Sequence, residues 1–214
     1  MSFDKEKLKA VILHVCAKCD PSNLGAIKLH KVLYFSDMLR YANVGDSITG
    51  STYRKRPLGP TCEQLLGTLS ELQRVGALEI TRVNYFGYLK KQFSAKVKPD
   101  TNRLSADELA LLDEVIEFVC DANSAKTISE FSHNRAWDMV EFGDIIEYKS
   151  VFQIFPIEVS EKSKEWAASE VKQLEDKTSG GKTPLGGKLL GEFREFILQA
   201  RGKARTVLGT ARLH

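Results

Sequence analysis

The chain has 214 residues, 43% of them hydrophobic and 28% charged, which is ordinary for one globular domain with a sizeable core and an appendage. The net charge of +3 is too small to indicate a nucleic-acid-binding protein by itself. The apolar runs are too short to cross a bilayer and the N-terminus lacks the apolar block of a secretory signal, so we expect a cytoplasmic protein with no membrane partner.

Two helices are predicted at the N-terminal end. Apolar residues recur at helical spacing over residues 3–19 and form one face of an amphipathic helix. After a proline-containing turn, residues 24–42 are apolar around most of the helical circumference, which favours a position at the centre of the domain. Burial accounts for the apolar members of this second helix but leaves Lys28, Lys31 and Asp37 unexplained.

A capped helix and a β-hairpin follow. Residues 48–58 are predicted to run extended across the surface. The capping box Thr61-Cys62-Glu63-Gln64 then starts a helix that ends near residue 75, with Thr61 as the N-cap and Gln64 reaching back to it. Apolar and polar residues alternate over 77–83 and 88–97, which is typical of the two strands of a hairpin.

Two more helices complete the main domain. Ser105 and Glu108 form a capping box that opens a helix over 106–121, and Thr127 opens another that runs to about Arg135. Residues 136–158 mix short helical and extended patterns. The fold class is therefore expected to be mainly α (α+β): a compact helical domain with one β-hairpin, its elements in a winged-helix-like order.

The composition changes near residue 160. Residues 161–177 are charged and predicted to be helical, 178–187 form a Gly-rich linker, and 188–200 read as a short amphipathic helix. We expect a main domain over 1–158 and a helical appendage over 159–214.

The four cysteines leave two interpretations open. Cys16 and Cys19 form a CxxC, but a structural zinc site needs four ligands. A redox CxxC follows a thioredoxin-like strand, whereas this one closes a helix. We therefore favour two helix-end thiols over metal or redox chemistry, and expect neither a metal nor another cofactor.

Two motifs that suggest catalysis fail on inspection. Gly181-Lys182-Thr183 and Gly186-Gly187-Lys188 resemble parts of a phosphate loop, but the spacing, the preceding strand and the magnesium-binding hydroxyl are missing. His133 has Asp138 and Asp144 nearby in sequence, but no serine or cysteine lies in a nucleophile motif. His133 and Trp137 are four residues apart, which favours packing of the two rings over catalysis.

One ordered set of short segments is more informative. Lys28-Leu29-His30-Lys31-Val32-Leu33-Tyr34-Phe35-Ser36-Asp37 is followed by Ile48-Thr49-Gly50-Ser51-Thr52-Tyr53, by Leu58-Gly59-Pro60, and by Ser132-His133 with Trp137 and Gly143-Asp144-Ile145-Ile146. Over about residues 8–155 this set resembles the signature of the SocA-like Panacea antitoxin domains.

The resemblance implies a non-enzymatic antitoxin that blocks a cognate toxin protein by direct contact. A homodimer is a second candidate assembly, which the resemblance does not decide. The resemblance assigns partner binding to a set that we call the signature residues: Lys28, Lys31, Tyr34, Asp37, Tyr53, Gly59, Pro60, His133 and Trp137.

The alternative function is a winged-helix DNA-binding regulator, with its own promoter as a candidate target. The hairpin region is basic, and its candidate nucleic-acid contacts are Arg82, Lys90, Lys91, Lys96 and Lys98. The first residues of a recognition helix read the bases, and here Glu63 and Glu71 would face phosphates unfavourably. Any DNA binding is therefore expected to be weak.

Overall fold

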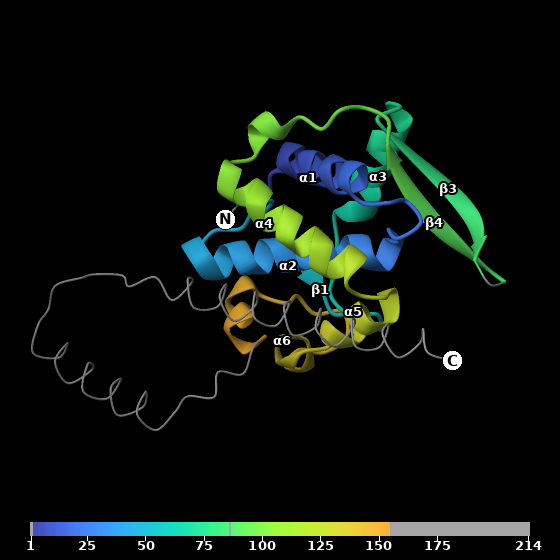
Figure 1. Ribbon diagram of the computed structural model, residues 1–214. Coiled ribbons are helices and arrows are strands. Elements are labelled where there is room, and N and C mark those ends of the chain that lie inside the picture. The colour runs from blue at the N-terminus through green and yellow to red at the C-terminus, as the bar shows by residue number, and fades with distance from the viewer. Residues whose placement is uncertain (1, 86, 155–214) are drawn as a thin grey trace, which may run out of the picture.

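The structure is a computed structural model that describes residues 2–85 and 87–154 (Figure 1). In chain order the helices and strands are α1 (Lys5–Lys18), α2 (Ala26–Val44), β1 (Tyr53–Arg54), β2 (Thr61–Cys62), α3 (Leu65–Arg74), β3 (Leu78–Tyr85), β4 (Tyr88–Ala95), η1 (Thr101–Arg103), α4 (Ala106–Ile116), η2 (Glu117–Asp121), α5 (Ala125–Phe131), α6 (Arg135–Asp138) and η3 (Tyr148–Gln153). The predicted mainly α fold with α1, α2 and α3 ahead of the β3–β4 hairpin is confirmed.

Helix α2 lies at the centre of the domain, as its apolar circumference predicts. Helices α1, α4 and α5 and the short η3 pack around it (Figure 1). Leu29, Val32 and Met38 have no exposed surface. Because most of this helix is buried, a charged side chain that it carries there is stabilised only by partners inside the protein.

The β3–β4 hairpin projects from one side of the helical core (Figure 1). Its antiparallel register pairs Leu78 with Ala95, Ile80 with Phe93 and Arg82 with Lys91. Phe93 is buried against the core, and the strands contact α1 and α3. The apolar side chains on one face of the strands, such as Phe93, therefore attach the base of the hairpin to the domain.

The start of α3 differs from the prediction. Thr61 and Cys62 form strand β2, which pairs antiparallel with β1, so Thr61 does not cap a helix. The Gln64 side chain accepts a hydrogen bond from the Thr52 N–H at 3.0 Å and does not reach back to Thr61. The capping-box pattern was wrong here because a distant strand provides a backbone partner for this segment, and the domain has this small ladder in addition to the predicted hairpin.

The later helices are interrupted where the prediction made them continuous. The capping box of Ser105 and Glu108 is confirmed, but α4 ends at Ile116 and continues as η2, a π-helical segment. The helix expected to begin at Thr127 is α5, which Ser124 caps, and it stops at Phe131. Asn134 then caps the separate α6.

The predictions for the appendage lie outside the described residues: the helix over 161–177, the linker over 178–187, the helix over 188–200 and the boundary at 158. Within residues 2–85 and 87–154, no helix combines the length and the apolarity needed to cross a membrane.

Candidate functional site

The signature residues lie on three segments that meet beside α2: the helix itself, residues 53–60, and residues 132–137. All nine of them are buried or half-buried. Seven are buried, namely Lys28, Lys31, Tyr34, Asp37, Tyr53, Gly59 and Pro60, whereas His133 and Trp137 are half-buried. The structure divides them into an Asp37 group, a Lys31 group and a His133–Trp137 stack, with Lys28 apart from all three.

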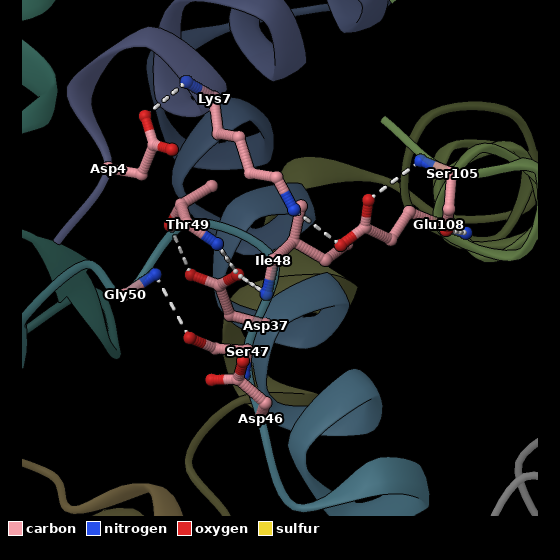
Figure 2. Close-up of polar contacts among 10 residues, drawn as sticks. All are labelled: Asp4, Lys7, Asp37, Asp46, Ser47, Ile48, Thr49, Gly50, Ser105 and Glu108. Carbon is pink, nitrogen blue, oxygen red and sulfur yellow. Dashed lines mark hydrogen bonds and ion pairs between the residues drawn. The ribbon is translucent and has the colours of Figure 1, made fainter. Parts of the chain in front are cut away.

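Asp37 holds the loop after α2 against the core (Figure 2). Its Oδ1 accepts hydrogen bonds from the backbone N–H groups of Ile48 at 3.0 Å and Thr49 at 2.9 Å. Its Oδ2 accepts from the Thr49 hydroxyl at 2.5 Å and from the Tyr53 hydroxyl at 2.8 Å. Burial raises the pKa of Asp37, and these hydrogen bonds oppose the rise. Asp37 thus sets the path of the chain from α2 into β1.

The same loop borders a polar cleft of about 790 Å³. Asp4, Lys7 and Asp46 lie on its walls, and Lys7 forms an ion pair with Glu108 at 2.8 Å (Figure 2). Glu108 also accepts a hydrogen bond from the Ser105 N–H at 2.8 Å. These contacts fasten the start of α1 to the start of α4, so the side chains are used in holding helix ends together.

The Lys31 group explains why residue 59 is a glycine. Lys31 Nζ donates a hydrogen bond to the Pro60 carbonyl at 3.0 Å, and burial lowers the pKa of Lys31 to about 7. Gly59 has φ +91°, and a Cβ there would lie 2.2 Å from Ser132 Oγ and 2.5 Å from Lys31 Nζ. The Ser132 hydroxyl donates to the Ser129 carbonyl at 2.7 Å. The backbone at Gly59 is therefore clamped between α2 and the segment after α5.

His133 and Trp137 stack, as predicted, with ring centroids 4.2 Å apart and an interplanar angle of 22°. His133 precedes α6, so the pair does not share a helix. Burial lowers the pKa of His133, and the charge of Lys31 lowers it further. The Trp137 indole donates to the Arg56 carbonyl at 3.2 Å, which ties the stack to the segment before Gly59.

Sequence reasoning missed the residue on the other side of Trp137. Lys55 is buried, and its Nζ lies 3.9 Å from the centroid of the Trp137 ring and 5.1 Å from that of Phe142. It also donates to the Val140 carbonyl at 2.8 Å. In the sequence Lys55 is one member of a basic run, and no local pattern signals its two aromatic neighbours.

Exposed apolar side chains lie on the segments that carry the stack. Residues 54–56 and 137–145 are joined by hydrogen bonds, among them Lys55 N–H to the Asp144 carbonyl at 3.0 Å. We call the following set the apolar face: Leu58, Trp137, Met139, Phe142 and Ile145. Four of them are exposed, and Trp137 is half-buried. An apolar pocket of about 370 Å³ adjoins Leu58, between the start of α2 and residues 56–61.

The candidate nucleic-acid contacts lie on the hairpin and just after it. Arg82 and Lys91 are exposed and directly opposite each other in the ladder. Lys96 forms an ion pair with Glu79 at 2.7 Å, and Lys90 donates to the Ser22 carbonyl. Lys98 is exposed beyond β4.

Glu71, which the sequence placed towards phosphates, instead forms ion pairs with Lys5 at 2.5 Å and Lys9 at 2.7 Å. Glu71 therefore joins α3 to α1, and its charge is paired with two lysines.

Cys16 and Cys19 are both buried at the end of α1. In the described part of the chain, no three His, Cys, Asp or Glu side chains gather as ligands of a metal would. Lys28 lies in the same region and donates to the Cys120 carbonyl at 2.8 Å, and burial lowers its pKa.

The comparison with known families finds a match over the part of the chain that contains most of α2 and the elements that follow it up to α6. The model of the family described as antitoxin SocA-like, Panacea domain, matches residues 29–138, which is just over half of the chain. The match runs from α2 to the end of α6 and contains every signature residue except Lys28. No curated protein and no solved structure matches the chain. The chain belongs to the family of SocA-like antitoxins with a Panacea domain.

Proposed function

We propose that this protein is a cytoplasmic antitoxin that neutralises a separately folded toxin by binding it directly, without turning over a small molecule. Membership of an antitoxin family supports the role. The main observation in favour of direct protein binding is the exposed apolar face beside the signature residues.

The apolar face has the composition of a protein-binding surface. Aromatic residues and Met are enriched at the centres of interfaces, and this face combines Trp137, Met139 and Phe142. The adjacent pocket, between Ile27 and Leu58, suits an apolar anchor side chain from a partner. Arg56 is exposed beside Leu58, and Asp138, Glu141 and Asp144 are exposed among the other apolar residues, so the proposed toxin surface has an apolar centre with charges of both signs around it.

The buried signature residues support this surface and do not touch the toxin. Side chains such as Lys31, Asp37 and Tyr53 have 1% exposed surface each, which leaves no area for a partner. Asp37 sets the course of the chain towards residues 54–58, and the Lys31 group fixes the turn at Gly59. The signature residues thus determine where Leu58 and the aromatic stack lie.

The experiment is coexpression with the protein encoded beside this chain, followed by growth measurement and isolation of the complex. Met139→Asp and Phe142→Asp are expected to abolish neutralisation and to weaken binding at least about tenfold, since charges are costly in an interface core. Leu66→Asp on α3 is the matched control, because Leu66 and Met139 are 64% and 63% exposed.

Two results would contradict the proposal. If the Met139→Asp, Phe142→Asp and Leu66→Asp variants bind the toxin equally well, the apolar face is not the toxin-binding surface. Group transfer or hydrolysis by the isolated chain that is lost in a His133→Ala variant would replace the antitoxin by an enzyme.

A second function, weak DNA binding, is favoured by the register that places Arg82 opposite Lys91 on the hairpin. We rank it below toxin binding because two of the five candidate cations, Lys90 and Lys96, already have partners within the chain.

For the appendage over 159–214, we propose association with the toxin or with a second copy of the chain. A free helix as short as 188–200 is marginal in water, and a tether raises the effective concentration of even a weak contact. A chain ending at Lys177 is expected to lose neutralising activity or to change its oligomeric state. Retention of both, with unchanged thermal stability, would show that the segment is dispensable.

A further inference from the structure

Two buried cysteines meet at the C-terminal end of α1. Cys19 is the residue that ends this helix, and its Sγ lies 3.0 Å from Sγ of Cys120. The two residues are 101 positions apart in the chain, and their exposed fractions are 5% and 2%. The pair therefore joins the first helix to the segment between α4 and α5.

Cys120 lies in an unusual stretch of backbone. Helix α4 ends at Ile116, and η2 continues it as a π-helix over Glu117–Asp121. The wider turn is closed by the Ala122 N–H, which donates to the Glu117 carbonyl at 3.0 Å. Single π-helical turns inside helices frequently accompany functional sites, and this one carries the cysteine that faces Cys19.

The surroundings make the two thiols unequal. Cys19 donates the hydrogen bond of its S–H to Cys120 Sγ, which lowers the pKa of Cys120, and the nearby charge of Lys28 lowers it further. The same hydrogen bond, together with burial, raises the pKa of Cys19. Cys120 is thus the thiol that loses its proton more readily, and Cys19 is the thiol that holds its proton more tightly.

We propose that Cys19 and Cys120 are a modification site, at which hydrogen peroxide forms a reversible intramolecular disulfide. The Cys120 thiolate attacks one peroxide oxygen, the O–O bond breaks, and Cys120 becomes a sulfenic acid as hydroxide leaves and takes up a proton. Cys19 then attacks the Cys120 sulfur, the S–O bond breaks, and water leaves. Two thiols are oxidised by two electrons, and one peroxide is reduced to two waters.

The bond would need little movement, because the two sulfurs must approach by only about 1 Å to reach the length of a disulfide. It would close a loop of about 100 residues, which constrains the unfolded chain strongly. The oxidised protein should therefore unfold at a higher temperature than the reduced protein.

The test uses the full chain, reduced, freed of reductant and then treated with hydrogen peroxide. Two of the four thiols should disappear, the mass should fall by two hydrogen atoms, and dithiothreitol should reverse both changes. Trypsin cleaves after Lys18, so Cys16 and Cys19 fall on separate peptides, and a non-reducing digest should contain the Cys19 peptide linked to the Cys120 peptide.

Variants identify the role of each sulfur. Cys19→Ser should leave a sulfenic acid on Cys120 that dimedone traps, and Cys120→Ser should leave none. Cys62→Ser is the matched control because Cys62 is also buried and burial raises its pKa to about 11; it should form the disulfide normally. In the wild type, Cys120 should react at least about tenfold faster than Cys62, since the thiolate is the reactive species.

Several outcomes would overturn the proposal. Retention of all four thiols in the folded protein would show an inert buried pair. A Cys16–Cys120 link, or equal oxidation of Cys62, would assign the chemistry elsewhere. The wild-type digest decides between these results even if a variant does not fold.

Discussion

Replacement of Gly59 by alanine tests the clamp between Lys31 and Ser132 directly. We expect Gly59→Ala to be strongly destabilising for two separate reasons. An alanine at φ +91° is conformationally strained, which costs about 1–2 kcal/mol. Its Cβ would also lie 2.2 Å from Ser132 Oγ and 2.5 Å from Lys31 Nζ, so one of these groups must move, and overpacking of this kind costs about 1–3 kcal/mol.

Gly143→Ala separates the two contributions. Gly143 has φ +96°, close to that of Gly59, but a Cβ there would meet nothing within 4 Å. Its loss of stability should therefore reflect the backbone strain alone. The free energy of unfolding, measured by urea denaturation with circular dichroism, should fall about 1–3 kcal/mol further for Gly59→Ala than for Gly143→Ala, with unchanged m-values.

A double-mutant cycle with Ser132→Ala assigns the clash. Removing Ser132 Oγ takes away the closest atom, so the Gly59→Ala substitution should cost less in a Ser132→Ala background, by an interaction energy of about 0.5–3 kcal/mol. Equal losses for Gly59→Ala and Gly143→Ala would refute the steric reasoning, and an additive cycle would show that Ser132 is not the obstacle.

The remaining predictions concern Asp37, Lys31 and the hairpin. Asp37→Ala should lower the free energy of unfolding by about 3–5 kcal/mol, because it leaves buried donors without their charged acceptor, and Asp37→Asn should cost less; equal losses in urea denaturation would contradict this. The pKa of Lys31 is lowered to about 7 from 10.5, so the unfolded chain binds more protons above pH 7 and stability should rise with pH, by at most about 1.4 kcal/mol per unit. In the Lys31→Met variant, the free energy of unfolding should rise less with pH between pH 7 and about 8.5, a range that ends where cysteine thiols begin to ionise. If the wild type and the variant show the same dependence on pH, Lys31 does not titrate as a buried lysine. Binding to duplex DNA, titrated at several salt concentrations, should be weak and should fall steeply as salt rises. Replacing both Arg82 and Lys91 with Gln should reduce the slope of log K against log salt by about 2. Nanomolar, sequence-selective binding at physiological salt would instead favour the DNA-binding alternative.

The contrast between the two capping boxes shows where local patterns suffice. Ser105 and Glu108 cap α4 as predicted, because both hydrogen bonds lie within one turn of chain. In the equivalent pattern from Thr61 to Gln64, the first two residues form β2 instead, because the Tyr53–Arg54 segment offers backbone partners. A pattern of four residues cannot register a competing backbone partner that lies seven to nine residues away.

The candidate site shows the same division. The sequence identified Gly59 and Asp37 as members of a family signature but did not give their roles. Those roles depend on Ser132 and Tyr148, which are far away in the chain and which approach only when α5 and η3 pack on α2. Lys55 likewise acquires its aromatic neighbours from residues more than eighty positions later.

By itself, the sequence determined the mainly α class, the central position of α2, the β-hairpin and the family, since periodicity and short motifs are local properties of the chain. Only the tertiary structure decided that the polar signature residues are buried, that exposed apolar side chains lie on the neighbouring segments, and that Cys19 meets Cys120. Each of these depends on contacts between residues distant in sequence, which form only when the helices pack.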